Sequence, residues 1–468
     1  MRIIKQVTAL SIEKEDAALD QEEVAHAVIA RLEAEGHSAY LVGGCVRDKL
    51  MNRSVKDYDV TTSALPEQVI ASFARTLPTG LQHGTVTVVI QGTPVEVTTF
   101  RTESKYEDHR RPASVTFVPE LREDLQRRDF TINAIAMERS GRLIDPYGGR
   151  TDIERKVIRC VGDAHERFEE DALRMLRCLR FASNYMFSIE EGTWLALLDK
   201  APLLRHIAME RVEAELTKMI AGTDPLRALR LLARSGLLRH TKIPLGAFAE
   251  RIALAASEHP DPPSQQTASS VKEREELPER LHRWTELSGD VMRWAFLFAA
   301  VQLSPEEAAQ GMMALVFPRR KSDRIVKLLE FKQVIDREIN SIAGTSELSD
   351  EKLNMFFKKQ ALRYGKSNAQ DWLAINALLV TFRGPYARLY VRLSDSGAQW
   401  LEEIALWDRT ELAVTGAEIA DALGREAGPW TAQMLDRLLA EAALQGTEND
   451  KSRLILLAQQ YGKELEMP

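Results

Sequence analysis

Apolar and polar residues follow two different periods along this chain. Residues 21–36 place apolar side chains at helical spacing and end at a glycine, which predicts an amphipathic helix. Residues 84–90 and 93–100 instead alternate and are rich in β-branched side chains, and Gln91-Gly92 between them is typical of a hairpin turn. The N-terminal part therefore combines helices with a sheet.

Other segments complete this small mixed sheet with helices on its face. Residues 63–74 predict a helix with Ser63 as its cap and Pro66 in its first turn. Residues 142–149 predict a short strand and turn. Residues 101–116 are polar, charged and broken by Pro112, which predicts an exposed loop. Both a mobile lid and a passive connection remain open for this loop.

From about Ala164 onward the pattern predicts helices only. In residues 165–185 a polar stripe along a predicted helix is formed by side chains that recur every three residues: Asp171, Arg174, Arg177 and Arg180. On statistics alone, a solvated, salt-bridged face is the favoured interpretation of this stripe. Residues 256–285 are rich in Pro, Ser, Gln and charge, which predicts a mobile insertion. The remaining helices break near Phe317-Pro318, Gly344 to Ser349, Gly384-Pro385 and Gly428-Pro429.

Composition narrows the class of protein. A chain of 468 residues exceeds one ordinary core and predicts about three or four domains or subdomains. No apolar run approaches the ~18 residues of a membrane span, and no leader is evident at the start, so we expect a cytoplasmic protein without a membrane partner. A net charge of −7 argues against a generally basic nucleic-acid surface, so any RNA contact must be local. The three cysteines are too few and scattered for a disulfide framework or a zinc site.

The richest candidate chemistry lies in residues 41–60. On a strand, Asp57 and Asp59 would point to one side while Tyr58 points to the other. Two carboxylates on one face suit Mg²⁺, which binds one or two carboxylates together with substrate phosphates. Upstream, Gly43 and Gly44 have no side chain and let backbone amides approach a phosphate, and Arg47 lies one helical turn further on. A DxD alone is also typical of a solvated turn.

Glu96 is a further candidate in the second strand of the hairpin. If that strand lies beside the aspartate strand, Glu96 supplies a third acid for the metal or accepts the proton of an attacking hydroxyl. An ordinary solvent-facing glutamate explains the position equally well.

The motifs GGCVRD, DYD, RRDFTINA and EDALRMLR occur in this order. With them the chain resembles bacterial tRNA nucleotidyltransferases of class II, the CCA-adding enzymes, in the superfamily that includes poly(A) polymerases. The resemblance implies an α+β fold: a small mixed-sheet nucleotidyltransferase head followed by an all-helical neck, body and tail. The boundaries that we expect are 20–163 for the head, 164–240 for the neck, 241–405 for the body and 406–468 for a tRNA-binding tail.

The resemblance also implies roles for individual residues. The metal ligands of the family fall on Asp57 and Asp59, and Mg²⁺ is the expected ion. Its nucleotide contacts fall on Gly44, Arg47, Arg128, Asp171, Arg174, Arg177 and Arg180. The implied activity is addition of the 3′-terminal CCA to tRNA from CTP and ATP, without a nucleic-acid template and with release of pyrophosphate.

The choice of base follows from hydrogen-bond chemistry at two of these residues. Asp171 offers only acceptors and Arg174 only donors, which together match the amino group and ring nitrogen that cytosine and adenine share. Uracil and guanine would set acceptor against acceptor and donor against donor, which is costly in a buried site. A protein surface can therefore select CTP and ATP.

Several alternatives remain open on sequence. A-adding enzymes share these motifs; CC-adding relatives lack the flexible loop that residues 101–112 supply here. Poly(A) polymerases of the family usually carry a basic segment where this chain has LQHGTVTVVI. A catalytically silent tRNA-binding protein would not need Asp57 and Asp59.

Ala208 stands where the family often has a hydroxyl residue that caps a helix. The sequence leaves the oligomeric state open.

Overall fold

The computed structural model describes residues 20–103, 106–107, 111–112, 115–255, 283–342, 350–379 and 386–464. These fall into two compact units, one formed by the chain up to Asp224 with 234–244, the other by 225–233 with the chain from Leu245. Head, neck, body and tail boundaries at 163, 240 and 405 stay predictions. Residues 256–282 of the predicted insertion lie outside the described residues, and Arg283–Glu286 form the short 3-10 helix η5.

The first unit contains a mixed sheet, as predicted, and this sheet has seven strands. Only the pairing of β2 with β5 is parallel; the other neighbours are antiparallel. In spatial order the strands are β11 (Leu143–Ile144), β10 (Ala136–Met137), β1 (Ala39–Val42), β2 (Asp59–Thr62), β5 (Thr93–Thr99), β4 (Thr85–Ile90) and β3 (Thr76–Gly80). The hairpin of β4 and β5 turns at Gln91-Gly92, as the alternation predicted.

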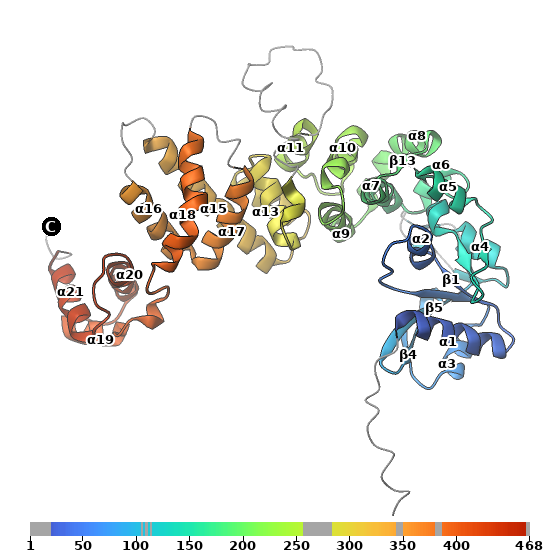
Figure 1. The fold of residues 1–468 in the computed structure, drawn as a ribbon, viewed down its shortest axis with the longest axis horizontal. Coiled ribbons are helices and arrows are strands. Elements are labelled where there is room, and N and C mark those ends of the chain that lie inside the picture. The colour runs from blue at the N-terminus through green and yellow to red at the C-terminus, as the bar shows by residue number, and fades with distance from the viewer. Residues whose placement is uncertain are drawn as a thin grey trace, which may run out of the picture. The chain divides into compact units, whose positions relative to one another are not determined.

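The two faces of this sheet differ in chemistry. Val60, Val86, Val88, Val95 and Val97 are buried, and α1 (Gln21–Ala34) lies against β2 and β5 while α3 (Pro66–Ser72) lies against β4 and β5 (Figure 1). Because successive side chains of a strand alternate, the intervening residues face the other side. That opposite face carries threonines together with Asp59 and Glu96, so apolar burial on one face fixes which acids the other face presents.

Two local predictions were wrong. The helix predicted from Ser63 begins at Pro66, because Leu65 is its cap residue and the Gln68 side chain accepts from the Leu65 amide at 2.8 Å; the Ser63 hydroxyl instead accepts from the amide of Ser38. The predicted loop 101–116 contains paired strands: β6 (Arg101–Glu103) with β9 (Val115–Phe117), and β7 (Tyr106–Glu107) with β8 (Arg111–Pro112). Two-residue ribbons tolerate a proline that a central strand would not.

The helical part of the first unit differs from the prediction at one residue. The helix predicted across residues 165–185 is two helices, α6 (Ala164–Glu170) and α7 (Leu173–Tyr185). Asp171 between them is extended, with φ −139° and ψ 101°, and its carboxylate accepts from the amide of Leu173 at 3.1 Å. Asp171 thus ends one helix and starts the next, because a side-chain acceptor satisfies an amide left free at a helix start.

The remaining elements of the first unit surround the sheet and α7. They are α2 (Gly44–Leu50), η1 (Leu81–His83), α4 (Leu121–Gln126), η2 (Thr131–Asn133), α5 (Gly149–Arg155), β12 (Val157–Ile158), β13 (Ser188–Ile189), α8 (Glu191–Lys200), η3 (Ala201–His206), α9 (Met209–Ile220) and η4 (Leu237–His240). α9 packs along α7. Ala208 precedes α9 without a side-chain cap, as its sequence indicated.

The second unit is helical. Its helices are α11 (Ala247–Ala255), α13 (Asp290–Ala300), α14 (Pro305–Ala314), α15 (Arg319–Ile342), α16 (Asp350–Tyr364), α17 (Lys366–Leu379), α18 (Ala387–Glu402), η8 (Arg409–Glu411), α19 (Gly416–Leu423), α20 (Pro429–Leu444) and α21 (Lys451–Glu464), while α10 (Pro225–Ser235) belongs partly to each unit. The breaks at Pro318 and Pro429 are confirmed. A break at Gly365, with φ 93°, was not predicted, and those near 344–349 and 384–385 lie at undescribed residues.

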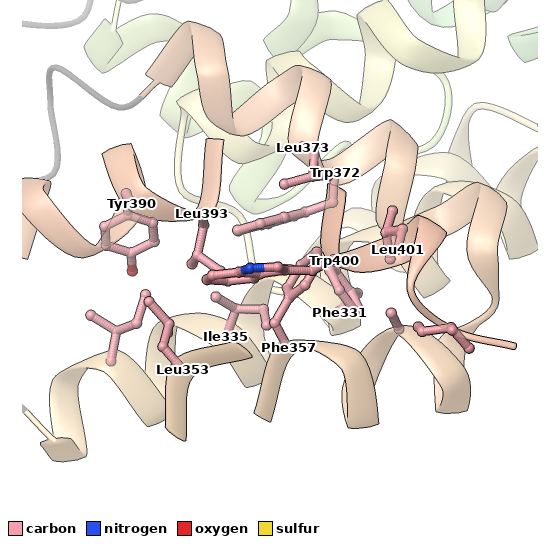
Figure 2. Packing of buried hydrophobic residues seen from close by; sticks show 14 of the residues in the cluster. Phe331, Ile335, Leu353, Phe357, Trp372, Leu373, Tyr390, Leu393, Trp400 and Leu401 are labelled. Atoms are coloured by element: carbon pink, nitrogen blue, oxygen red, sulfur yellow. The ribbon is translucent and has the colours of Figure 1, made fainter. Parts of the chain in front are cut away.

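An aromatic cluster forms a core in the second unit. Phe331, Phe357, Trp372 and Trp400 come from α15, α16, α17 and α18 (Figure 2). The ring of Phe357 contacts the other three rings, and those of Phe331 and Trp372 also contact each other. In the part of the chain that the structure describes, no helix is both long and apolar enough to span a bilayer. All three cysteines are buried and free, in agreement with their predicted role in packing.

Candidate active site

A cavity of about 610 Å³ opens in the first unit between the sheet, the segment after α4, and α7. Eight arginines and three aspartates contribute to its lining, so positive side chains outnumber negative ones there. The lining residues are Gly43, Gly44, Arg47, Asp59, His83, Arg101, Arg127, Arg128, Asp129, Asn133, Asp171, Leu173, Arg174, Arg177, Arg180, Phe181 and Arg211. A cavity of this charge suits a polyanion such as a triphosphate.

Asp59 is the acid that the sheet presents to this cavity. It is half-buried at the start of β2 and is paired in register with Glu96 of β5. Burial, followed by the negative charges of Glu96 and Asp57, raises the pKa of Asp59 to about 6 against the attraction of Arg128. A carboxylate held among other acids in this way is stabilised by any cation that it binds.

Asp57 is placed differently from the prediction. The strand begins at Asp59, so Asp57 lies before it and is exposed rather than in the strand. Tyr58 is buried as predicted, and its hydroxyl donates to Glu22 of α1 at 2.5 Å. The bond from Tyr58 to Glu22 fixes the backbone between the two aspartates. Whether both carboxylates point to the same side depends on the conformation of the chain before β2.

The diglycine brings an arginine close to the backbone. Gly43 precedes α2 with φ 76°, a conformation that favours glycine. A Cβ atom at this position would lie 2.9 Å from Nη1 of Arg128. The missing side chain therefore makes room for a guanidinium beside the turn.

Arg47 is held from three sides. Its Nη1 donates to Oδ1 of Asn133 at 2.6 Å, and its Nε and Nη2 donate to the carboxylate of Asp48, each at 3.0 Å. Its guanidinium lies over the rings of Phe181 and Tyr185, 5.4 and 4.8 Å from their centroids. Arg47 is thus a rigid part of the cavity wall.

Asp129 joins the segment after α4 to helix α7. It accepts from Nε and Nη2 of Arg177 at 2.8 and 2.7 Å and from Nδ2 of Asn133 at 2.9 Å. Burial alone would raise the pKa of Asp129, but the charge of Arg177 and the bond from Asn133 outweigh it and lower the pKa to about 2. Asp129 is therefore ionised at neutral pH.

Helix α9 holds two residues of the polar stripe. Nη2 of Arg211 donates to Asp171 at 2.8 Å, and Glu215, four residues further on, accepts from Nε of Arg180 at 2.6 Å. Arg174 is 7 % exposed and donates to the backbone oxygen of Arg127 at 2.9 Å. The stripe is therefore a fixed wall of the cavity and not a solvated helix face.

Most of the predicted site residues meet in this cavity. They are Gly44, Arg47, Asp59, Arg128, Asp171, Arg174, Arg177 and Arg180. Asp57 and Glu96 are exposed and are not among its lining residues. The role of each residue stays a prediction.

Sequence reasoning missed other residues of the wall. Arg127, Asp129 and Asn133 belong to RRDFTINA, where only Arg128 had been assigned a role, and Arg211 lies in the helix MERVEAEL. The motif drew attention to the right segment. Only the folded chain shows which of its side chains line the cavity.

Comparison with known proteins identifies the family. The model described as "Poly A polymerase head domain" matches residues 39–159, "Probable RNA and SrmB- binding site of polymerase A" matches 186–243, and a model of tRNA nucleotidyltransferase domain 2 matches 286–458. The CCA-adding enzyme of Geobacillus stearothermophilus is 38% identical over 429 residues, which are 91% of this chain and 94% of that protein. That of Geobacillus thermodenitrificans (strain NG80-2) is 37% identical over 428 residues, with the same coverage.

A solved structure agrees with these relatives. The crystal structure of Bacillus stearothermophilus CCA-adding enzyme in complex with CTP has a TM-score of 0.75 and 33% identity, and covers 96% of this chain and 99% of that one. The matched length includes both compact units. The chain belongs to the CCA-adding enzyme family and is a tRNA nucleotidyltransferase.

Proposed function

We propose that this chain adds CCA to the 3′ end of tRNA from CTP and ATP, with Mg²⁺ and without a nucleic-acid template. The observation that carries this proposal is one cavity whose lining includes the half-buried Asp59, Asp171 and eight arginines, Arg174 among them. Metal binding, triphosphate binding and base selection are thereby combined within the reach of one nucleotide. The relatives named CCA-adding enzyme support the same activity.

The acids fit a hard cation bound by two carboxylates. Among the described residues, no group of three or more His, Cys, Asp or Glu side chains is arranged to hold a metal ion. Mg²⁺ commonly takes one or two carboxylates and completes its shell with water and substrate phosphates. Asp57 and Asp59 are the proposed ligands. Burial, followed by the charges of Glu96 and Asp57, raises the pKa of Asp59, and a bound cation would stabilise its ionised form. When bound, the ion would neutralise charge on the phosphates and orient them.

The remaining chemistry falls to the side chains. In this proposal Arg47, Arg128, Arg177 and Arg180 bind the triphosphate near the backbone of Gly44. The tRNA 3′ hydroxyl attacks the α-phosphorus, the bond to the β-phosphate oxygen breaks, and pyrophosphate leaves. Glu96, opposite Asp59 on the neighbouring strand, accepts the proton of the hydroxyl. Positioning and charge neutralisation supply most of the rate enhancement.

Base selection is proposed for Asp171 and Arg174. The bond from Arg211 fixes the Asp171 carboxylate at the break between α6 and α7. A carboxylate so held keeps acceptor capacity for an exocyclic amino group. The bond from Arg174 to the backbone oxygen of Arg127 holds its guanidinium at the wall of the same cavity. Cytosine and adenine match this pair, and uracil and guanine do not.

An assay of three tRNAs tests the function. Transcripts that end at the discriminator base, at C and at CC are each incubated with Mg²⁺ and labelled CTP, ATP or both. We expect all three to reach CCA. Extension of the CC-ended tRNA alone indicates an A-adding enzyme, addition of C alone a CC-adding enzyme, and long A tails a poly(A) polymerase. No incorporation on any of them leaves a tRNA-binding protein and refutes the enzymatic proposal.

A substitution tests base selection separately. Asp171→Ala should relax the choice of base and raise incorporation of UTP relative to CTP. Asp163→Ala is the control, since Asp163 caps α6 and does not line the cavity. Unchanged rejection of UTP by Asp171→Ala refutes the assigned role even if CCA addition persists.

The other parts of the chain keep their predicted roles as proposals. The tail, 406–468, is proposed to bind tRNA, and the activity is placed in the cytoplasm, where tRNA maturation occurs. Electrophoretic binding of tRNA by the full chain and by a chain that ends before residue 406 tests the first of these.

A further inference from the structure

Asp124 is a buried acid that lies behind the cavity wall. It belongs to α4, its side chain is fully inaccessible to solvent, and it is not among the lining residues. A carboxylate removed from water in this way is costly unless it is well paired, so its partners indicate what it does.

The two carboxylate oxygens of Asp124 hold the two neighbouring arginines. Oδ1 accepts from Nε and Nη2 of Arg127 at 3.0 and 2.8 Å, and Oδ2 accepts from Nη2 of Arg128 at 3.3 Å. Burial raises the pKa of Asp124, but the charges of Arg127 and Arg128 outweigh it, and the net pKa lies below its usual value. The acid is therefore an anion between two cavity arginines.

Asp124 also reaches two strands. The hydroxyl of Thr61 lies 3.4 Å from Oδ2, and the amide of Arg101 lies 3.4 Å from Oδ1. Thr61 follows Asp59 by two residues on the same face of β2. Arg101 begins β6, where the chain leaves the sheet. The carboxylate of Asp124 thus contacts both arginines and the strand that carries Asp59.

We propose that Asp124 is a positioning residue that fixes Arg127 and Arg128 relative to Asp59, so that both guanidinium groups meet the β- and γ-phosphates of the incoming nucleotide. It contacts neither nucleotide nor metal. This inference rests on the proposed function, because it assumes that the cavity binds a triphosphate. Both CTP and ATP depend on it equally, since the phosphates are common to them.

The test compares Asp124→Asn with the unaltered chain. We expect the KM for CTP and for ATP to rise by the same factor, about tenfold, because charge-assisted bonds orient more strongly than neutral ones. The inhibition constant of pyrophosphate should rise by a similar factor, and kcat should fall less. A purely structural role instead lowers the active fraction and leaves KM and pyrophosphate inhibition unchanged.

The chain supplies a matched control. Asp152 of α5 is also buried, pairs with Arg159 at 3.2 Å and accepts from the hydroxyl of Thr131 at 2.7 Å, and neither Asp152 nor Arg159 lines the cavity. Asp152→Asn should lower the melting temperature without changing either KM. Equal KM changes in both variants overturn the proposal.

Two further outcomes are separable. If the unaltered chain extends no tRNA, the proposed function fails and the inference falls with it; if it extends tRNA while Asp124→Asn keeps both KM values, only the inference fails. Should Asp124→Asn not fold, Thr61→Val removes the hydroxyl that lies 3.4 Å from Oδ2 of Asp124 and 3.1 Å from the backbone oxygen of Thr98, and keeps a strand-forming side chain. It should raise both KM values about twofold with an unchanged ratio, and unchanged values refute the inference.

Discussion

The cavity of the first unit is lined mainly by charged side chains, whereas the core of the second unit is formed by aromatic rings. The cavity wall consists of buried and half-buried charges, such as Asp129 with Arg177 and Asp171 with Arg211, that form ion pairs with one another. The core consists of rings: Trp372 is completely buried, with its ring centroid 5.5 Å from that of Phe331. Both regions are fixed in place, but by different kinds of interaction.

This difference indicates that the charged wall mainly orients groups for function and that the aromatic core mainly stabilises the fold. Buried ion pairs regain little more than the cost of removing their charges from water, so they orient groups more than they stabilise the fold. Buried aromatic rings stabilise because they remove a large apolar area from water. Substitutions in the two regions should therefore separate activity from stability.

The largest effect is expected at the sheet acid. Asp59→Asn should lower the rate of CCA addition by about 10⁴-fold, which corresponds to about 5.5 kcal/mol, because the variant loses a carboxylate that we propose as a metal ligand. Folding should not suffer, since the raised pKa of Asp59 means that its charge is disfavoured in the folded state. The measurements are single-turnover incorporation and thermal unfolding, with exposed Glu67→Gln as control. Full activity of the variant contradicts the assignment.

The aromatic core should respond in the opposite way. Trp372→Ala should destabilise the second unit by about 3 to 5 kcal/mol through loss of burial and the cavity left behind. Hydrogen exchange of α15 to α18 measures this, and binding of CTP to the first unit should be unchanged. Trp372→Phe keeps an apolar ring and should cost far less. Equal exchange rates in the alanine variant would show that the cluster does not carry the core.

Acid should affect the first unit through Asp129. Its pKa in the folded chain is about 2, against an ordinary value of 3.8, so its contribution is present above about pH 4 and is lost as the pH falls through 2. The size is about 2 kcal/mol. Hydrogen exchange of β5 and α7 at pH 4.5 and 2.5 measures it. Asp129→Asn should remove this part of the pH dependence; an unaltered slope contradicts the network.

The smallest expected effect is an increase in the stability of the first unit. Ala208→Ser supplies the missing cap of α9 and should stabilise the first unit by about 1 kcal/mol, because the hydroxyl accepts from an amide left free at the helix start. Since α9 carries Arg211 and Glu215, the same change should slow local opening of the wall, measurable by exchange of α9 amides. Ala208→Val adds bulk without an acceptor and should bring no gain.

Secondary-structure elements could be predicted from the sequence where they depend only on neighbouring residues. The helix at residues 21–34 and the β4–β5 hairpin follow from periodicity, because burial of one face selects the period. The prediction across Asp171 failed, since helical spacing continues through it while its side chain caps a new helix. The cap at Ser63 failed because that hydroxyl bonds to Ser38, a partner distant in sequence.

By itself the sequence determined most of the elements, the order of the motifs and the kinds of side chain available for chemistry. Tertiary structure decided their partners: the parallel pairing that sets Asp59 beside Glu96, the bonds from α9 to α7, and the place of Asp124 behind two arginines. The physical reason is that periodicity reports only burial within one element. Ion pairs between elements depend on strand register and helix packing, which side chains far apart in the chain determine together.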